Sequence, residues 1–386
     1  MEHLVVFSHL RWNFVYQRPQ HLMSRLALRW RVVFVEEPMA GADPVRGPHL
    51  ERIAPCKGVQ VWRPHVAGDA PGFHDDHIAT LQALLADAMR GERVRDYWAW
   101  LYTPMAYPLA ASLSPRGLAY DCMDELSAFR NAPRQLVQRE SALFKAADLV
   151  FTGGPSLYNA KKDKHPDVHC FASSVDSRHF ARSASDHPAQ ARLPRPRMGW
   201  CGVIDERVDL ALVEALARAR PHWQVVMVGP IAKIDPASLP RLPNIHWLGQ
   251  RDYDELPELI SGWDVCLLPF ALNEATRYIS PTKTLEYMAC GRPAVSTPIR
   301  DVAEPYADVV SIAATHDEFL AACDALLARD ADERATHARA MSEVVARTSW
   351  DATAQAMARL IDRKDALRKM REAMPQGVSS RRAAAA

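Results

Sequence analysis

Residues 273–297 read NEATRYISPTKTLEYMACGRPAVST, and this stretch combines a polar loop, a short helix and the start of a strand. Ser280 suits the N-cap of the helix, and Pro281 suits its first position because that position needs no backbone N–H. Gly291 and Pro293 then end the helix. The polar loop follows an apolar strand, so we expect the N-terminus of the helix to face a cleft at the carboxyl ends of the strands.

We expect this helix to end near Cys290. Two of its charged residues do not suit a purely structural role. Lys283 lies in the first turn, where a cation opposes the helix dipole, and Lys three residues before Glu is the weaker orientation of such a pair. An anion at the helix N-terminus, held by free backbone N–H groups and by Lys283, would explain this order. Lys283 would then suit a phosphate and Glu286 a diol. The alternative is an exposed Lys–Glu pair on a surface helix.

Apolar β-branched runs alternate with helical patterns on both sides of this stretch. Such alternation is typical of βαβ units and of a mostly parallel sheet that is covered on both faces. Strands are predicted at 4–7, 32–35, 59–62, 98–102, 118–121 and 149–151, and again at 198–201, 223–229, 245–249, 265–268, 294–296 and 309–312. Helices are predicted at 18–29, 75–90, 133–147 and 350–370.

Residues 181–197 interrupt this alternation with three prolines and no apolar periodicity, a composition typical of a linker. We therefore predict an α/β fold in which two Rossmann-like, doubly wound domains face a cleft. The predicted parts are a first domain 1–180, the linker 181–197, a second domain 198–349, a terminal helix 350–372 and a flexible tail 373–386.

Composition and charge narrow the classes of function. The 47 Lys and Arg residues against 46 Asp and Glu residues leave a net charge of +1, which disfavours a dedicated nucleic-acid binder. The seven cysteines are scattered and form no CxxC motif, as is typical of reduced thiols in a cytoplasmic protein. No run has the length of a membrane-spanning helix, and the N-terminus reads as a strand rather than as a signal peptide. We therefore expect a cytoplasmic protein.

One arginine-rich segment bears on membrane contact. Arginines at positions 90, 93 and 95 precede aromatic residues at 97, 98 and 100. Such a mixture could contact the inner face of a membrane peripherally. The alternative is a solvated helix end followed by a buried strand.

A second cationic loop follows the first strand of the second domain. Residues 202–210 read GVIDERVDL, which places Arg207 near a helix start. The alternative for Arg207 is a local ion pair with Glu206 or Asp209. The glycines here do not form GxGxxG, and no P-loop motif occurs, so a dinucleotide-dependent dehydrogenase and a P-loop NTPase are disfavoured. No spacing of His, Cys and Asp residues predicts a metal site.

Polar residues also follow two strands of the first domain. His9 and Arg11 come after the first strand, and Arg18 and His21 stand where a helix begins. Asp124 follows the strand predicted at 118–121, and a carboxylate at the end of a parallel strand can act as a base in the cleft. The alternatives are a turn or capping acid for Asp124 and partly buried imidazoles for the two histidines.

The order and spacing of these motifs resemble the GT-B glycosyltransferases, specifically the family 4-like bacterial enzymes that build cell-surface polysaccharides. Residues 280–297 resemble their donor-binding block S-P-x-K-x-x-E-Y-x-A-x-G-x-P-V-V-S-T, and residues 248–269 resemble the segment before it. Residues 174–180 are similar to the signature that closes the first domain, and 349–351 to the start of a helix that crosses back to it. Residues 12–21 resemble a subgroup that includes enzymes of teichuronic-acid-type polymer synthesis.

The resemblance implies a glycosyltransferase that moves a sugar from a nucleoside-diphosphate sugar of the UDP or GDP type to a glycan or lipid-linked acceptor. It implies retention of stereochemistry and no metal or other cofactor. Glu286 would hold the ribose hydroxyls, while Lys283 and Arg207 would meet the diphosphate. His9 and Asp124 are the expected catalytic residues.

The resemblance also places further residues around the site. It implies donor contacts from Arg277, Tyr278 and Ser280, and the acceptor-side residues are Arg11, Arg18 and His21. Tyr278 stands where the family has a first Glu, eight positions before Glu286, so the hold on the donor sugar and the stereochemistry stay open. Two alternative functions are a non-catalytic GT-B subunit that binds nucleotide sugar and a GT-B sugar-nucleotide 2-epimerase.

Overall fold

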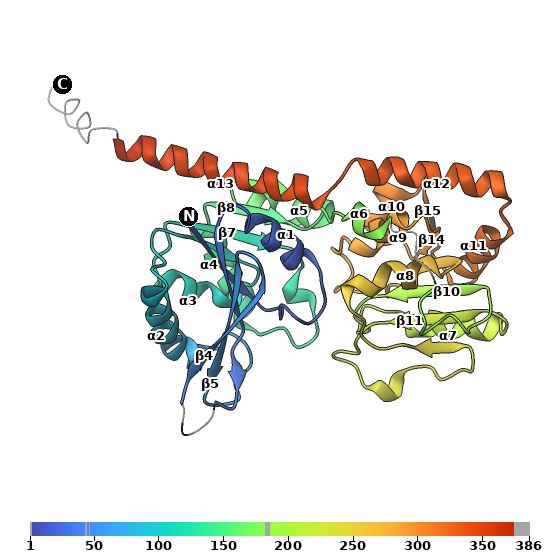
Figure 1. Ribbon diagram of the computed structural model, residues 1–386, viewed down its shortest axis with the longest axis horizontal. Coiled ribbons are helices and arrows are strands. Elements are labelled where there is room, and N and C mark those ends of the chain that lie inside the picture. Colours follow the sequence, from blue (N-terminus) through green and yellow to red (C-terminus); the bar gives the residue numbers. More distant parts are fainter. Residues whose placement is uncertain (1, 43–44, 46, 182–185, 374–386) are drawn as a thin grey trace.

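The computed structural model describes residues 2–42, 45, 47–181 and 186–373, and it contains two sheets joined by connecting segments (Figure 1). The predicted flexible tail 373–386 lies outside the described residues except for Ala373. Residues 182–185 of the predicted linker also lie outside them.

The first sheet has the strand order β3-β5-β2-β1-β6-β7-β8-β9, and β4 pairs with β5. Its pairings are parallel except for the antiparallel pairing of β4 with β5. The strands are β1 (His3–Ser8), β2 (Arg31–Glu36), β3 (Met39–Ala40), β4 (His49–Cys56), β5 (Val59–Val66), β6 (Trp98–Leu101), β7 (Gly117–Cys122), β8 (Leu149–Thr152) and β9 (Val168–Cys170). The six strands predicted here are confirmed. Strand β4 was not predicted because it is a half-exposed strand whose sequence, HLERIAPC, has no continuous apolar run.

The second sheet is parallel throughout, with the order β12-β11-β10-β13-β14-β15. Its strands are β10 (Arg197–Cys201), β11 (Gln224–Val228), β12 (Ile245–Trp247), β13 (Val265–Leu268), β14 (Ala294–Ser296) and β15 (Val310–Ile312). Each confirms a predicted strand. The open parallel order, with its crossover beside β10, is that of a doubly wound sheet, which binds ligands at the carboxyl ends of its strands.

Helices connect and cover these strands. The α-helices are α1 (Arg18–Leu26), α2 (Asp75–Gly91), α3 (Tyr107–Ser112), α4 (Gln135–Ala146), α5 (Pro155–Lys161), α6 (Ser177–Phe180), α7 (Leu210–Ala219), α8 (Leu256–Ser261), α9 (Thr282–Ala289), α10 (Arg300–Tyr306), α11 (His316–Ala328), α12 (Ala331–Ala346) and α13 (Trp350–Ala373). Short 3₁₀ helices are η1 (Pro104–Ala106), η2 (Leu126–Ala128), η3 (Lys162–Lys164), η4 (Pro236–Ser238) and η5 (Tyr253–Glu255).

The terminal helix α13 crosses back to the first domain, as the resemblance implied (Figure 1). Met357 and Ile361 of α13 are fully buried and belong to the same hydrophobic core as Leu22 of α1. Arg25 of α1 also pairs with Asp351, with 2.5 Å between Nε and Oδ1. The chain therefore leaves the first domain, builds the second, and returns to complete a core of the first.

Serine hydroxyls and one aspartate connect the two domains near the start of α9. The amide of Ser156 donates to Oδ1 of Asp301 at 3.0 Å. The hydroxyl of Ser173 donates to the carbonyl of Ser280, and the Ser173 amide to the Ser280 hydroxyl. The predicted N-cap role of Ser280 is therefore wrong: Pro281 is the N-cap residue and makes no side-chain cap. The Ser280 hydroxyl serves the contact between domains instead.

The described part of the predicted linker, 186–197, packs on the second sheet. The Gln190 side chain is fully buried, donating to the carbonyl of Leu259 at 2.8 Å and accepting from the Trp263 indole at 2.9 Å. Arg197 already belongs to β10 and is buried beside Asp186. A segment with a polar, proline-rich sequence is thus held by side-chain hydrogen bonds rather than by an apolar stripe.

The arginine-rich segment does not present its aromatic residues at a surface. Tyr97, Trp98 and Trp100 are buried in and beside β6, so the membrane interpretation of this segment is wrong and the buried-strand alternative holds. Trp98 and Trp100 point to the same face of the sheet and belong to one hydrophobic core, while Tyr97 belongs to the core on the other face. Within 2–42, 45, 47–181 and 186–373, no helix has both the length and the apolar character needed to cross a bilayer.

Candidate active site

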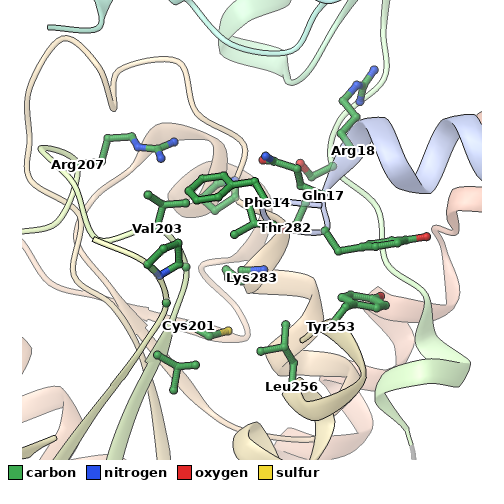
Figure 2. A pocket seen from close by; sticks show the side chains of 18 of the residues that line it. Phe14, Gln17, Arg18, Cys201, Val203, Arg207, Tyr253, Leu256, Thr282 and Lys283 are labelled. Carbon is green, nitrogen blue, oxygen red and sulfur yellow. The ribbon is translucent and has the colours of Figure 1, made fainter. Parts of the chain in front are cut away.

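A cavity of about 460 Å³ lies between the two domains (Figure 2). The second domain lines it with residues that follow β10 and β11 and with the start of α9. The first domain lines it with the loop before α1 and the turn after β7. The cavity is therefore at the carboxyl ends of the strands of the second sheet, where doubly wound sheets bind ligands.

Lys283 lies in the first turn of α9 and lines this cavity (Figure 2). Its Nζ is 2.9 Å from Oε2 of Glu286, and the two side chains are 16% and 2% exposed. Burial lowers the pKa of Lys283, but the carboxylate of Glu286 outweighs that effect and the pKa lies above its usual value. The predicted alternative of an exposed surface pair is wrong, because both side chains are largely buried and Lys283 lines the cavity.

Glu286 is placed behind Lys283 rather than on the cavity wall. Among the described residues, those that line the cavity end at Lys283 in this helix and do not include Glu286. The geometry shows a carboxylate that neutralises Lys283 and fixes where its ammonium group lies. Such a pair leaves the free backbone N–H groups of the first turn of α9 to an incoming anion.

Arg207 lines the same cavity from the loop before α7 (Figure 2). Its guanidinium forms a two-pronged ion pair with Asp205, at 3.0 Å from Nε to Oδ1 and 2.7 Å from Nη2 to Oδ2. The expected alternative partners are wrong, since Glu206 pairs with Arg130 and Asp209 caps α7. Both hydrogen bonds form together because the two carboxylate oxygens of Asp205 match the spacing of the guanidinium N–H donors.

Arg207 also contacts the first domain. Its guanidinium lies over the ring of Phe129 at 5.4 Å, and the ammonium of Lys233 lies over the same ring at 5.0 Å. Beside this ring, the Arg130 amide donates to Glu206 at 2.9 Å. The first-domain segment after η2 is thus held against the second domain by cation–π and ionic contacts at the cavity.

Asp124 is a half-buried carboxyl group on the first-domain side of the cavity. It caps no helix, since η2 beside it begins without a side-chain cap, and the capping alternative is therefore wrong. Burial raises the pKa of Asp124 to about 6, while the nearby cations of Arg207 and Arg18 act in the opposite direction. A carboxyl group with a pKa near neutrality can exchange a proton with a ligand hydroxyl.

The two candidate histidines do not line the cavity among the residues described. Burial lowers the pKa of His9 to about 4, so its imidazole is neutral at pH 7. His21 is 1% exposed and stacks on Trp350 with ring centroids 4.8 Å apart. It also meets Tyr253 edge to face at 5.4 Å, so His21 fills the junction between the domains and α13.

The two acceptor-side arginines differ in their placement. Arg18 lines the cavity while its guanidinium binds Asp121 at 2.9 Å and the carbonyl of Phe171 at 2.7 Å. Arg11 pairs with Glu36, with 3.2 Å between Nη1 and Oε2, and is not among the described cavity residues. Only Arg18 of this pair therefore meets the cavity.

The residues before α9 divide in the same way. Ser280 lines the cavity, whereas Arg277 is 61% exposed and pairs with Glu274 at 3.5 Å. Tyr278 packs against a hydrophobic core of the first domain. Tyr278 thus serves packing against the first domain, and Arg277 lies outside the described cavity wall.

The loop 12–17 was not predicted to reach the second domain, although it lines much of the cavity. The side chain of Gln250 donates to the carbonyl of Phe14, and the ring of Tyr16 stacks on Tyr253 at 4.4 Å. The only local sign that this loop could line a cavity was its mixture of aromatic and polar residues after a strand. Its partners are more than 230 residues away along the chain, so no local pattern identified them.

Comparison with known proteins gives a consistent result. Residues 207–359 match a family described as "Glycosyl transferase-like". Over 257 residues the chain is 26% identical to TuaH of Bacillus subtilis (strain 168), whose name assigns it provisionally as a teichuronic acid biosynthesis glycosyltransferase. That match covers 60% of this chain and 64% of TuaH.

Solved structures resemble more than nine-tenths of the chain. An Escherichia coli trehalose-6-phosphate protein bound with UDP-2-fluoro glucose has a TM-score of 0.69 at 14% identity, covering 93% of this chain and 99% of that one. Sucrose-phosphate synthase from Thermosynechococcus elongatus has a TM-score of 0.69 at 16% identity, and the match covers 95% of this chain and 100% of that one. Anabaena HepE in complex with UDP and glucose has a TM-score of 0.67 at 15% identity, and the match covers 93% of this chain and 99% of that one. The predicted fold class is confirmed: two doubly wound domains facing a cleft, with a returning terminal helix, are the GT-B fold.

Proposed function

We propose that this protein is a glycosyltransferase that moves a sugar from a nucleoside-diphosphate sugar to a glycan or lipid-linked acceptor in bacterial surface polysaccharide synthesis. The observation that carries the proposal is Lys283 in the first turn of α9, facing a cavity that Arg207 lines from the neighbouring loop. An anion there meets backbone N–H groups, an ammonium and a guanidinium together. The match to TuaH supports a role in a surface polymer, and the UDP complexes of similar folds support a UDP-type donor.

Lys283 and Arg207 are the residues we assign to the donor diphosphate. Each is already fixed by its own carboxylate, Glu286 or Asp205, so the ligand meets cations whose positions are set in advance. Glu286 accordingly acts in the proposal as a positioning residue for Lys283. Ser280 is assigned to the cavity wall, where its contact with Ser173 joins the two domains.

In the proposed reaction, the bond between the anomeric carbon and the diphosphate breaks while a bond to the acceptor oxygen forms. Lys283 and Arg207 stabilise the negative charge that grows on the leaving diphosphate, in a cavity partly closed to water. We propose on this basis that the transfer needs no metal. EDTA should therefore leave turnover unchanged, and loss of turnover that Mg²⁺ or Mn²⁺ restores would contradict that part of the proposal.

Asp124 is the group that we assign to the acceptor hydroxyl. Its half-buried carboxyl faces the donor site from the first domain and can hold the hydroxyl by a hydrogen bond. Retention is proposed from the resemblance alone; with retention the acceptor enters from the face that the diphosphate leaves, so a departing phosphate oxygen can take the proton. The anomeric configuration of the product, read by NMR, tests this: an inverted product would make Asp124 the base instead.

The central test is ligand binding and turnover of the full chain with UDP, GDP and their sugars. We expect Lys283→Ala to weaken nucleotide-sugar binding by tenfold or more and to abolish most turnover. Arg218→Ala, which removes an exposed cation paired with Glu214 on α7, is the matched control and should bind as the wild type does. Equal binding by Lys283→Ala and the wild type would refute the site assignment.

The same measurements separate the alternative functions, neither of which the matches favour. A subunit that only binds would show Lys283-dependent binding and no transfer to any acceptor. An epimerase would convert the nucleotide sugar without an acceptor. A glycosyltransferase releases nucleoside diphosphate in proportion to the glycoside formed.

A further inference from the structure

A second cavity, of about 370 Å³, lies in the second domain at the opposite end of α9 from the cleft. It is lined by residues just before β13 and β14, at the amino ends of these parallel strands, and by α12 and the end of α11. We propose that this cavity binds the phosphate group of a small phosphorylated molecule. The inference does not depend on the proposed function, because no residue of the cleft takes part in it.

Three arginines bring positive charge to this cavity: Arg292, Arg329 and Arg334. They come from three different segments, namely the turn after α9, the C-cap of α11 and the first turn of α12. None of the three is in an ion pair with any described residue; Arg292 and Arg329 are half-buried, and Arg334 is exposed. Most other buried or half-buried arginines among the described residues are paired, including Arg18, Arg197 and Arg207. The cavity is thus a place where guanidinium groups meet without being paired to a described carboxylate.

The hydrogen bonds of these guanidiniums are incomplete within the described chain. Nη2 of Arg292 donates to the carbonyl of Ser261, and Nη2 of Arg334 donates to the carbonyl of Leu327 at 3.1 Å. Nε of Arg292 and Nη1 of Arg329 are buried and have no acceptor among the described residues. A buried N–H group without an acceptor costs free energy, and phosphate oxygens are the acceptors that guanidinium groups match best.

The other polar groups of the cavity do not neutralise the arginines. Asp264 is occupied elsewhere: Oδ1 accepts from Arg195 at 2.5 Å, and Oδ2 accepts from the Arg197 amide at 2.7 Å. Nε2 of His337 is 2.9 Å from the carbonyl of Val309. Burial lowers the pKa of His337, and the positive charge of Arg329 acts in the same direction, so the imidazole is neutral at pH 7. The cavity therefore keeps a positive charge that a dianion can balance.

The remaining wall is apolar and could hold the organic part of such a ligand. Leu326, Leu327, Ala338 and Met341 line it, beside Pro293. A cavity of this volume has room for more than inorganic phosphate. Guanidiniums beside an apolar wall fit a phosphate monoester with a ring or a short carbon chain.

Helix dipoles provide the competing explanation for two of the arginines. Arg292 and Arg329 follow the C-terminal ends of α9 and α11, where a cation stabilises the helix without any ligand. Arg334 does not fit that explanation, because it lies in the first turn of α12, where a cation opposes the dipole. The two explanations also predict opposite effects on stability when Arg329 loses its charge.

The test uses the full chain with Lys283→Ala as background, so that phosphate binding in the cleft is weakened, and the wild type in parallel. Calorimetry and thermal unfolding are followed with inorganic phosphate and with glucose 1-phosphate, and with chloride at equal ionic strength. We expect Arg329→Gln and Arg334→Gln each to weaken phosphate binding about tenfold. Arg218→Gln, an exposed arginine of α7, is the matched control and should bind as its parent does.

Stability without phosphate is the second readout. If the arginines are gathered for a ligand, Arg329→Gln relieves repulsion and leaves the Tm in chloride unchanged or raised. A lowered Tm together with undiminished phosphate binding would assign Arg329 to the helix dipole and overturn the proposal. Absence of phosphate binding in both parents, or equal stabilisation by chloride, would overturn it as well.

The two phosphate probes identify the source of the ligand. Tighter binding of glucose 1-phosphate than of inorganic phosphate, lost in Arg329→Gln, supports a phosphorylated metabolite that uses the apolar wall. Equal affinity for both probes would contradict the proposal of a phosphorylated metabolite and would identify inorganic phosphate as the ligand. A failed glycosyl-transfer assay affects neither result, so the two proposals fail separately.

Discussion

The two ends of α9 carry opposite arrangements of charge. At its N-terminus, Lys283 is paired with Glu286, and the neighbouring Arg207 is paired with Asp205, so the cations of the cleft are balanced within the protein. At its C-terminus, Arg292 faces a cavity with two further arginines and no available carboxylate. The helix has eight residues and so separates the two sites by only about 12 Å.

This difference shows two ways of preparing a site for an anion. Internally paired cations keep their positions without a ligand, so the cleft is already arranged for its substrate before the substrate binds. Unpaired cations depend on the ligand for their balance, so binding should raise stability and should weaken as salt screens the charges.

The largest expected effect follows from removing a paired cation of the cleft. Arg207→Ala should lower kcat by about 100- to 1,000-fold, the range found when one group that stabilises developing negative charge is deleted. Steady-state turnover with the donor selected by binding measures this. Since the Phe129 contact is also lost, Phe129→Leu is a companion variant: a loss of kcat as large as that of Arg207→Ala would assign the effect to domain contact rather than to charge.

The next effect concerns the carboxylate that balances Lys283. Glu286→Ala leaves a largely buried ammonium group without its partner and should lower the free energy of unfolding by about 3 kcal/mol. Urea unfolding measures this change. Glu286→Gln keeps the shape and should recover part of the loss through a hydrogen bond, whereas equal stability of all three proteins would show that the pair contributes nothing.

A smaller effect is expected from pH at the junction beside Lys283. Burial, with the positive charges of Arg25 and Lys283, holds the pKa of His21 well below 6.5, and burial lowers that of His9 to about 4. Both histidines are neutral in the folded chain and titrate near pH 6.5 when unfolded. Their contribution to stability is therefore complete above about pH 6.5 and is lost as the pH falls from there towards 4.

His21→Phe tests this by keeping a ring against Trp350 while removing the titrating group. Between pH 7 and pH 5, the variant should lose less stability than the wild type, by about 1 kcal/mol or more. Urea unfolding at both pH values gives the comparison. Identical pH dependence in the two proteins would mean that folded His21 takes up its proton as readily as the unfolded chain does.

The smallest effect is expected outside the described cavity, at the exposed pair of Arg277 and Glu274. Arg277 and Glu274 are 61% and 75% exposed, so Arg277→Ala should change the free energy of unfolding by less than about 0.5 kcal/mol. It should also leave donor binding nearly unchanged. A tenfold loss of donor binding would show that Arg277 moves into the site when the ligand binds.

Much of the fold was predictable because its signals are local. The alternation of apolar strands with helical patterns predicted both parallel sheets, and Gly291 ends α9 with a positive φ of 66°, as a helix-ending glycine does. Lys283 was singled out by its position in the first turn and by its order relative to Glu286, and it lines the cavity. These features depend on residues within one or two turns of each other.

Other features of the site needed the tertiary structure. The partner of Arg207, the place of Glu286 behind Lys283 and the interdomain role of Ser280 depend on which groups meet after folding. His21 stands beside other cleft candidates in the sequence, but it packs against Trp350 from the far end of the chain. No periodic pattern carries such information: the contact of His21 with Trp350, for example, forms only because α13 returns to the first domain.

For this protein, the sequence by itself determined the strands, the short helix α9 and the presence of a cation at its start, because hydrogen bonding and helix dipoles act over a few residues. Only the tertiary structure decided which cations are balanced and which are not. Arg292, Arg329 and Arg334 meet at one cavity through the packing of three helices, and the charge that results is a property of that packing rather than of any one segment.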